Sequence, residues 1–331
     1  MNPPDDLAGR DARVVWHPYT QHATDPEPLV VRGAHGALLE LGDGRAVIDA
    51  ISSWWCCLHG HGRPEIAAAI ADQARRLDQV QFAGCTHEPA VRLAERLVAL
   101  APRGLTRVFF SDDGSTAVEV ALKMALQAHA DRGEPQRSVF VALDGGYHGD
   151  TFGAMAVGDP DPFFAAFRPL LFEVRRVPVS ANAVAAALAE LGPRAAGVVL
   201  EPLVQGAAGM RMHDAAFVRA VRAACDERRV PLIADEVMTG FGRTGAVFAC
   251  ERAGVVPDHL CVSKGLSGGT LPIAATLVRE EVFAAFRSPD RRRTFFHGHT
   301  FTGNPIACAA SLASLDVFAA ERTHERLDAI G

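Results

Sequence analysis

Short apolar segments alternate with helical patterns along most of this chain, and this alternation limits the folds it can adopt. From residue 64 onward, most apolar segments are followed by a stretch in which apolar residues recur at helical spacing. Consecutive strands joined by helices pair in parallel, and the helices then cover both faces of the sheet. The sequence therefore predicts an α/β fold with a mostly parallel central sheet flanked by helices.

The predicted elements can be located by residue number. The strands are residues 107–110, 139–143, 197–200, 232–234, 260–262 and 273–278, and the helices are residues 65–77, 89–100, 116–130, 183–191 and 215–228. Upstream of them, residues 38–49 are predicted to form a β-hairpin, because a Gly-Asp-Gly segment separates two apolar runs. The charged segment 291–293 is predicted to be a solvated loop.

Composition excludes several classes of protein. The chain has 331 residues, of which 49% are hydrophobic and 22% charged, as in a folded globular protein of roughly two domains. The net charge of −6 argues against a surface for nucleic acid or anionic membranes. No apolar run approaches the ~18 residues of a membrane span, and the acidic start lacks a signal-peptide pattern. The seven cysteines lack the spacing of a metal site, so we expect a reduced, cytoplasmic setting.

Lysine is scarce in this chain. Only Lys123 and Lys264 are lysines among the 33 basic residues. Arginine stays protonated, whereas a desolvated lysine can lose its proton and form a Schiff base. A lysine that persists where arginine is preferred is therefore a candidate for chemistry. Lys264 follows a predicted strand and precedes a glycine-rich segment; the alternative is an ordinary surface lysine at a strand end.

Asp235 ends another predicted strand, and the next strand leads to Lys264. Ligands of open α/β sheets bind outside the carboxyl ends of the strands. We expect Asp235 and Lys264 to lie on one sheet edge, where a carboxylate could hold a cofactor's pyridine nitrogen protonated. The same carboxylate could instead cap the following turn.

Two further strand ends carry candidate binding residues. The segment SDDGST, residues 111–116, joins a strand to a helix, so Gly114 and Ser115 could hold a phosphate at the helix N-terminus. A plain helix cap by the same residues is the alternative. Tyr147, in DGGYHG, could stack on a planar cofactor or be a half-buried turn residue.

Two other patterns indicate different chemistry, and both are weak. The segment GFGRTG, residues 240–245, satisfies GxGxxG after a strand, but no convincing helix follows it as dinucleotide binding requires. The pairs His59 with His61 and His297 with His299 lack a third ligand in a metal-binding pattern, so loop histidines are favoured.

Several segments in order resemble one family. They are SDDGS, DGGYHG, LEPLVQGAAGM, ADEVMTGFGRTG, VSKGLSGG and FFHGHTFTGNPIACAA. This set is similar to the class III, ornithine-aminotransferase-like aminotransferases, which use pyridoxal 5'-phosphate (PLP). The resemblance implies a fold type I PLP-dependent transferase. It also implies that residues 1–51 begin a small domain, residues 52–318 form the large PLP-binding domain, and residues 319–331 start a C-terminal small domain whose remainder is missing here.

The resemblance also assigns roles to single residues. Lys264 would bind PLP covalently and then move a proton, and Asp235 would bind the pyridine nitrogen. The phosphate would be held by Gly114 and Ser115 and completed by Thr300 of a neighbouring subunit. Tyr147 would stack on the ring, and the substrate would be contacted by Tyr19, Trp54, Tyr147, Arg243 and Gly298. Tyr19 is also expected among the catalytic residues. The arginine that binds the substrate carboxylate in this family has no counterpart in this chain.

Within the family, the segments WHPYTQ (16–21) and SSWW (52–55) favour one reaction. The resemblance implies a homodimer that transfers the amino group of S-adenosylmethionine (SAM) to 8-amino-7-oxononanoate in biotin biosynthesis. Aromatic faces attract a sulfonium cation, and a long keto acid needs an apolar channel. The alternatives are another class III donor, such as lysine, a diamine or an ω-amino acid, an inactive PLP-binding chain, or a nucleotide-dependent oxidoreductase using residues 240–245.

Overall fold

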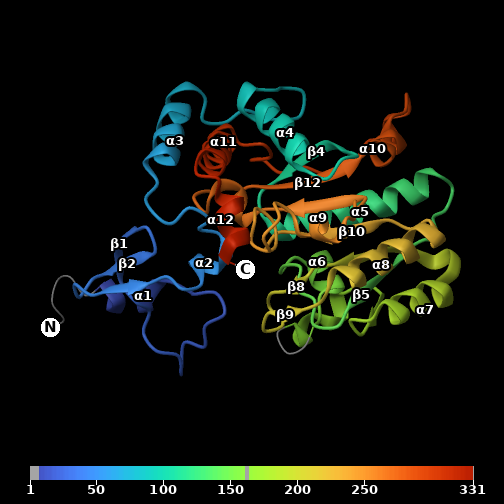
Figure 1. Cartoon of the computed structure of the whole chain (residues 1–331), viewed down its shortest axis with the longest axis horizontal. Helices are drawn as coiled ribbons and strands as arrows, with labels where there is room; N and C mark the ends of the chain where they lie inside the picture. Colours follow the sequence, from blue (N-terminus) through green and yellow to red (C-terminus); the bar gives the residue numbers. More distant parts are fainter. Residues whose placement is uncertain (1–6, 161–163, 331) are drawn as a thin grey trace.

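A seven-stranded sheet forms the centre of the protein, which we describe from a computed structural model for residues 7–160 and 164–330 (Figure 1). The strand order is β4-β12-β11-β10-β7-β5-β6. These strands are β4 (Leu105–Ser111), β5 (Val139–Leu143), β6 (Val174–Val177), β7 (Ala195–Leu200), β10 (Leu232–Asp235), β11 (His259–Val262) and β12 (Ala274–Arg279). All pairs are parallel except those of β12, which is antiparallel to both β4 and β11. The predicted α/β fold is confirmed, and β6 is a strand that the sequence analysis missed.

Helices cover both faces of the sheet. They are α3 (Pro64–Arg76), α4 (Glu88–Leu100), α5 (Gly114–Asp131), α6 (Phe152–Val157), α7 (Ala181–Leu191), α8 (Ala215–Arg228), α9 (Ala249–Ala253), α10 (Glu280–Phe286), α11 (Pro305–Ala320) and α12 (Thr323–Ile330). Figure 1 shows α3, α4 and α11 grouped at the β4 end of the sheet, and α7 and α8 at the β6 end.

The alternating directions of side chains along single strands explain why helices pack on both faces of the sheet. In β10, Ile233 packs with α5, whereas Leu232 packs with α8 and Ala234 packs with α4 and α11. Successive side chains of a strand point to opposite faces, and both faces here are covered by helices. Each central strand is therefore mostly apolar, with polar residues such as Asp235 and His259 at strand ends, and these apolar runs made the strands recognisable in the sequence.

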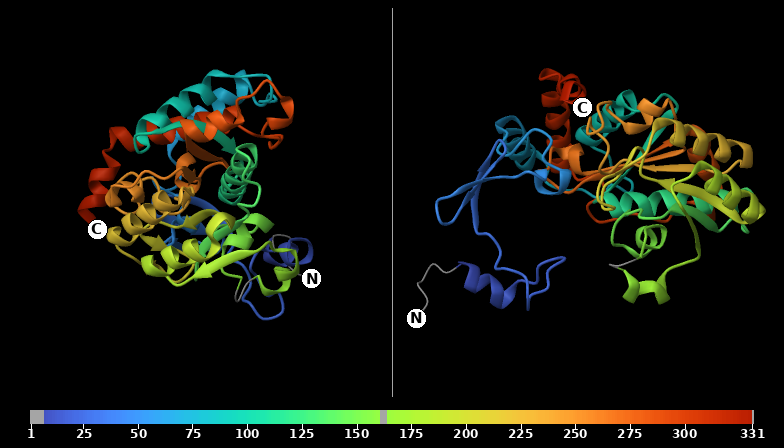
Figure 2. Two further views of the ribbon diagram at one scale, coloured as in Figure 1. Left: turned by 90° about the vertical axis from the view of Figure 1, so that its right-hand side faces the viewer. Right: turned by 60° about the horizontal axis from the view of Figure 1, so that its bottom comes forward.

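The N-terminal part projects from the sheet-containing body (Figure 2). It contains α1 (Leu7–Val14) and a small antiparallel sheet of β1 (Val31–His35), β2 (Leu38–Leu41) and β3 (Ala46–Ile48). The pairing of β2 with β3 confirms the predicted hairpin. A short ribbon of β8 (Val204–Gln205) and β9 (Arg211–Met212) follows β7. In the described part of the chain, no helix is both long and apolar enough to cross a membrane.

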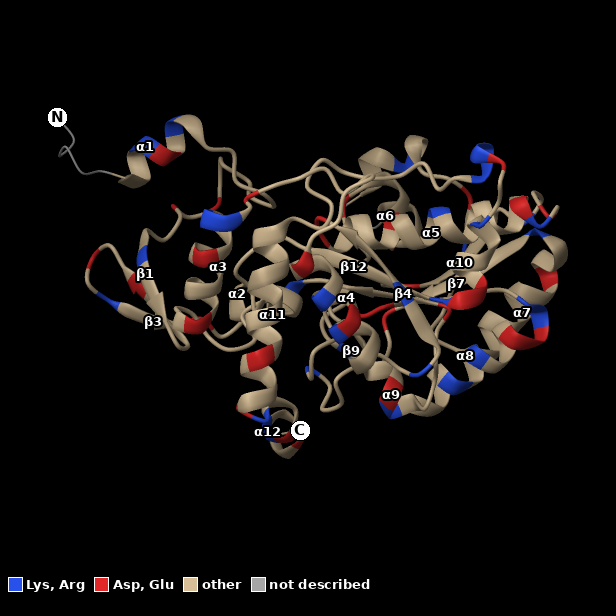
Figure 3. Ribbon diagram, turned by 90° about the horizontal axis from the view of Figure 1, so that it is seen from above, with Lys and Arg blue, Asp and Glu red and all other residues tan. Residues whose placement is uncertain are grey.

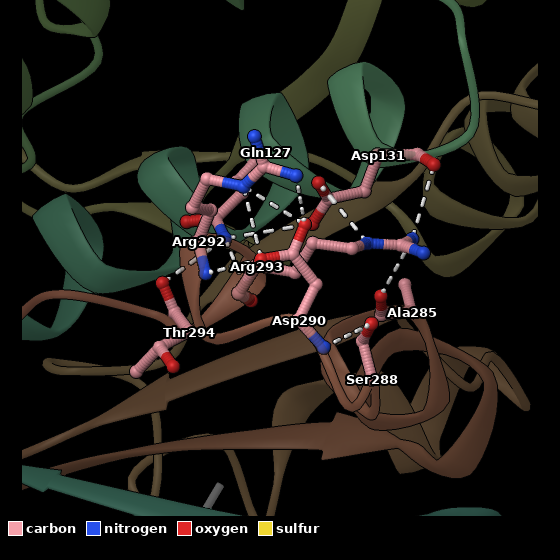
Figure 4. Close-up of polar contacts among 8 residues, drawn as sticks. All are labelled: Gln127, Asp131, Ala285, Ser288, Asp290, Arg292, Arg293 and Thr294. Carbon is pink, nitrogen blue, oxygen red and sulfur yellow. Dashed lines mark hydrogen bonds and ion pairs between the residues drawn. The ribbon is translucent and has the colours of Figure 1, made fainter.

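The charged segment 291–293 is only partly the solvated loop that was predicted. It forms a short 3₁₀ turn, in which Arg292 is exposed and pairs with Asp290. Arg293 instead donates to the backbone carbonyls of Asp131 and Ala285, at 3.0 and 3.1 Å, and so ties the turn to α5 and α10 (Figure 4). Elsewhere basic and acidic residues are interspersed over the outer helices (Figure 3).

Candidate active site

A cavity of about 960 Å³ lies at the carboxyl ends of the parallel strands. Five strand ends contribute to it: Asp112 and Asp113 follow β4, Tyr147 and His148 follow β5, Glu201 follows β7, Asp235 ends β10, and Lys264 follows β11. Residues 270–273 also line it, because antiparallel β12 begins at this edge, opposite the end of β4. The cavity therefore occupies the position at which open α/β sheets bind ligands.

Lys264 is partly buried in this cavity, in the left-handed region with φ of 44°. Its Nζ lies 4.7 Å from the centroid of the Trp55 ring. Desolvation lowers the pKa of the amine, although the nearby charges of Asp235 and Glu201 oppose that shift. A lysine with a lowered pKa is more often deprotonated, the state in which its nitrogen attacks a carbonyl carbon. This is the chemistry expected for Lys264 from the sequence.

Asp235 is buried one strand away from Lys264. Parallel pairing sets Asp235 beside Cys261, three residues before Lys264, which confirms that both residues lie on one sheet edge. One carboxylate oxygen lies 2.7 Å from His148 Nδ1, and the other accepts the backbone N–H of Val237 at 3.0 Å. The two hydrogen bonds hold the carboxylate in one orientation at the cavity.

The N-terminus of α5 lies at the cavity, in the position where an anion site was expected. The Asp113 side chain accepts the backbone N–H of Thr116 at 2.9 Å, so Asp113 is the helix cap. This cap leaves Gly114 and Ser115 at the cavity, where the first N–H groups of a helix lack intrahelical partners. A side chain at Gly114 would place its Cβ 2.5 Å from Val237 Cγ1, so only glycine fits there. The cap is therefore confirmed, and the binding of a phosphate by Gly114 and Ser115 stays a prediction.

Tyr19 reaches the cavity from the N-terminal part of the chain. Its hydroxyl donates to the Asp150 carboxylate and lies 3.2 Å from the Tyr147 hydroxyl, which also contacts Asp150 at 3.1 Å. Burial raises the pKa of both phenols, so both stay protonated near neutral pH. The Tyr19 ring meets Trp54 edge to face at 5.6 Å. The two expected tyrosines and Trp54 thus form one wall of the cavity.

The turn that carries the tryptophans is left-handed. Its four residues, the α2 segment Ser52–Trp55, have φ between 47° and 65°. Left-handed backbone costs roughly 1–2 kcal/mol for each residue other than glycine. The turn persists because Asp49 accepts the backbone N–H of Ser53 at 3.0 Å and its hydroxyl at 2.7 Å, and Arg243 donates to the Trp55 carbonyl at 3.0 Å.

His61 completes the support of this turn. His61 Nε2 lies 2.9 Å from Asp49, and the His61 backbone pairs with Gly36 in the β1–β2 connection. Asp49, Cys57 and His61 are the one group of described residues that could hold a metal ion. Yet the two His61 nitrogens face different partners, since Nδ1 lies 3.7 Å from Cys57 Sγ. In this structure hydrogen bonds link the three residues to one another, and the absence of a metal site here stays a prediction.

Three expected site residues lie outside the cavity of this chain. Arg243 contacts it only indirectly, through the Trp55 carbonyl. Gly298 and Thr300 are exposed and do not line it. Their assignments stay predictions.

The dinucleotide pattern at residues 240–245 is not a nucleotide site. The next helix, α9, begins only at Ala249. The first N–H groups of α9, from Ala249 and Cys250, donate to the buried Glu236 carboxylate at 2.6 and 2.8 Å. A pyrophosphate would need those donors.

Sequence reasoning missed several residues of the cavity. Glu201 is buried directly after β7, and desolvation raises its pKa well above the ordinary value, so its charge is disfavoured. Its place at a strand end is the signal that also marked Asp235. Cys56 and Met238 line the cavity as well, but their sequence context carried no such signal.

The residues of this cavity fit PLP. A partly buried lysine, a buried carboxylate one strand away and a glycine-lined helix N-terminus match an aldehyde, a pyridine nitrogen and a phosphate. A Cβ at Gly149 would lie 2.3 Å from Ser115, so the second glycine also keeps this cradle open. Fold and site together define a PLP-dependent enzyme.

Comparison with known proteins agrees. Residues 19–331 match the family described as aminotransferase class-III. The chain is 52% identical to an adenosylmethionine-8-amino-7-oxononanoate aminotransferase of Synechococcus elongatus, over 92% of this chain and 74% of the relative. It is 45% identical to the protein of that name from Geobacter sulfurreducens, over 94% and 74%.

Solved structures give the same result. The protein of that name from Methanocaldococcus jannaschii superposes with a TM-score of 0.93 at 39% identity, covering 97% of this chain and 76% of that one. An amine transaminase from an uncultivated Pseudomonas species, solved in its PLP-bound form, gives 0.87 at 34% identity, covering 93% and 74%. The chain belongs to the class III aminotransferases and is a PLP-dependent aminotransferase.

Proposed function

We propose that this enzyme transfers the amino group of SAM to 8-amino-7-oxononanoate, yielding 7,8-diaminononanoate in biotin biosynthesis. The aromatic wall of Tyr19, Trp54 and Trp55 beside Lys264 is the observation that carries this proposal. Lys264 Nζ lies 4.7 Å from the centroid of the Trp55 ring, so the face of this ring is open to a positively charged group inside the cavity. A sulfonium placed there would gain about 0.5–2 kcal/mol from the same attraction. The names of the relatives support the same substrates.

The acidic groups of the cavity also favour a cationic donor. Asp150 and Asp235 both line it. Asp150 sits between the two tyrosine hydroxyls, where a donor amine or sulfonium would find a counter-charge. The donor product must leave before the keto acid enters, because both substrates would use this one cavity. A ping-pong order follows.

The residues would divide the chemistry as follows. PLP, when bound, supplies the electron sink for amino transfer. Lys264 would hold the cofactor and then take and return a proton at Nζ, for which its lowered pKa is suited. Asp235, held by His148, would keep the pyridine nitrogen protonated. Tyr19 and Trp54 would orient the substrate and exclude water.

A second copy of the chain would complete the site. Phe296 and Phe301 are 69% and 59% exposed and flank Gly298 and Thr300. Exposed aromatic residues in one short segment favour a protein interface. In the proposed homodimer, Thr300 reaches the phosphate of the neighbouring site. The seven free cysteines fit the reduced cytoplasm as the location.

The visible absorbance spectrum of the PLP-loaded chain tests the reaction. SAM should convert the yellow lysine-bound cofactor to its amine form, and added 8-amino-7-oxononanoate should restore it. Conversion by lysine or a diamine but not by SAM would favour the alternative donors. A spectrum that no amine changes would favour an inactive PLP-binding chain.

A further inference from the structure

Thr151 stands at the N-cap position of α6, and the proposed function gives it no role. It lines the cavity together with Ser115, the second residue of α5. A threonine at an N-cap ordinarily uses its hydroxyl to accept an N–H from the first turn of its own helix. The Thr151 side chain makes no such bond. Its hydroxyl is therefore available for another partner.

Glu119 caps α6 in place of Thr151. One oxygen of its carboxylate accepts the backbone N–H of Gly153 at 2.6 Å and that of Ala154 at 3.1 Å. These are the N–H groups in the first turn of α6 that an N-cap side chain would otherwise accept. A Cβ at Gly153 would collide with the Glu119 carboxylate, so glycine is required for this approach. Glu119 is also one turn along α5 from Ser115, so one helix carries both residues.

The Thr151 hydroxyl contacts Ser115 instead of its own helix. Ser115 Oγ lies 2.7 Å from Thr151 Oγ1 and accepts the backbone N–H of Thr151 at 3.0 Å. A serine hydroxyl has two lone pairs and one proton. When the Thr151 hydroxyl is the donor, both lone pairs of Ser115 are occupied and its own proton is left free. An anion in the cavity is the acceptor that this proton needs.

We propose that Thr151 is a positioning residue for the cofactor phosphate. Its N–H and its hydroxyl together occupy the Ser115 oxygen, so that the Ser115 proton is directed to the phosphate. An ionised phosphate oxygen accepts a proton, so it favours this direction of the hydroxyl pair over the reverse. Each hydrogen bond in such a row polarises the next one and strengthens it. The inference rests on the phosphate site predicted at Ser115 and not on the identity of the amino donor.

Release of the cofactor from the loaded full-length chain tests this role. Loss of the yellow absorbance after dilution gives the release rate of PLP, and the same chain loaded with pyridoxal, which lacks the phosphate, gives the reference. Thr151→Val keeps the shape but removes the hydroxyl, and it should release PLP about fivefold faster, on the scale of one net hydrogen bond. Pyridoxal release should stay as in the wild type, and Thr151→Ser should restore slow release of PLP. Equal acceleration for both cofactors would overturn the proposal.

A double-mutant cycle with Ser115 shows whether Thr151 acts through that residue. Ser115→Ala alone should speed release of PLP and not of pyridoxal. In that background, Thr151→Val should add nothing, because the hydroxyl that it orients is already gone. A further fivefold acceleration would overturn the positioning role, since Thr151 would then contact the phosphate directly. Unchanged PLP release in Ser115→Ala would overturn the phosphate site and this inference with it. No donor is used, so failure of the proposed reaction is seen separately.

Glu119 provides a second test at a distance from the cofactor. Glu119→Ala leaves the N–H groups of α6 to the Thr151 hydroxyl, so PLP release should be about as fast as in Thr151→Val. Glu119→Gln keeps an oxygen that accepts those groups and should behave as the wild type. Thr106→Val is the matched control, because it removes an exposed threonine hydroxyl that contacts Glu280 at 2.9 Å outside the cavity. Wild-type release in Glu119→Ala would overturn the role of Glu119 in freeing the hydroxyl.

Discussion

The two sides of the cavity are built in different ways. On one side, Asp235 ends a central strand and Lys264 comes two residues after the adjacent one, and the side chains of these strands are buried on both faces of the sheet. On the other side, Tyr19 and Trp54 lie on irregular backbone in the left-handed region, held by side-chain hydrogen bonds. The difference indicates that the two sides have different roles. Cofactor chemistry rests on the rigid sheet, and substrate recognition rests on a strained wall that can change without disturbing the sheet.

Loss of Lys264 should reduce activity more than any other change, because it removes cofactor binding on the sheet side of the cavity. Lys264→Ala should abolish the visible absorbance of the covalently bound cofactor and lower the amino-transfer rate by about 10³-fold or more, because one nitrogen both binds the cofactor and moves the proton. Lys123→Arg is the control and should leave the absorbance unchanged. If the two variants behaved in the opposite way, the site would be wrongly assigned.

Removal of Asp49, which supports the strained turn Ser52–Trp55, should weaken binding of the donor on the other side of the cavity. Asp49→Ala leaves the Ser53 N–H and the His61 ring without their partner, so the turn loses its left-handed geometry. We expect KM for the donor to rise by about thirtyfold, the scale of a lost charge-assisted hydrogen bond, while the absorbance of the bound cofactor persists. Steady-state kinetics measure this split.

Asp43→Ala is the matched control for that variant, because Asp43 is an exposed carboxylate of the same N-terminal segment. Its kinetics should equal those of the wild type. Equal losses of cofactor binding and donor affinity in Asp49→Ala would show that the two sides are not independent.

Acid should weaken the sheet side through a buried histidine. His259 begins β11, is 1% exposed, and desolvation lowers its pKa to about 4. Because the unfolded chain protonates this ring near pH 6.5, it binds more protons than the folded chain between about pH 6.5 and 4. The free energy of unfolding should therefore fall by about 2 kcal/mol from pH 7 to pH 5 on account of this residue.

Chemical denaturation at pH 7 and pH 5 gives the free energy of unfolding of the wild type and of His259→Leu. The contribution of His259 is the difference between the two proteins in how much this free energy falls. The variant should lose less stability on acidification than the wild type. An equal fall in the free energy of unfolding for both proteins would mean that the imidazole is protonated as easily in the folded state as in the unfolded state.

The smallest effect is expected from a single aromatic ring of the wall. Trp54→Ala should raise KM for SAM by about tenfold, on the scale of one cation–π contact, with little change in kcat. A neutral donor analogue should bind both proteins alike and so serve as the control. An equal loss for charged and neutral donors would indicate packing rather than attraction of the cation.

The sequence alone determined the sheet and its chemistry. Apolar runs alternating with helices fix a mostly parallel sheet, and the carboxyl ends of parallel strands meet at one edge, so the strand pattern is enough to pair Asp235 with Lys264. The tertiary structure alone decided the antiparallel direction of β12, the left-handed turn at Ser52–Trp55 and the contact of Tyr19 with Asp150. These features depend on packing between residues distant in the chain. Local propensity disfavours a left-handed turn of serines and tryptophans, and the hydrogen bonds of Asp49 and Arg243 help to offset that cost.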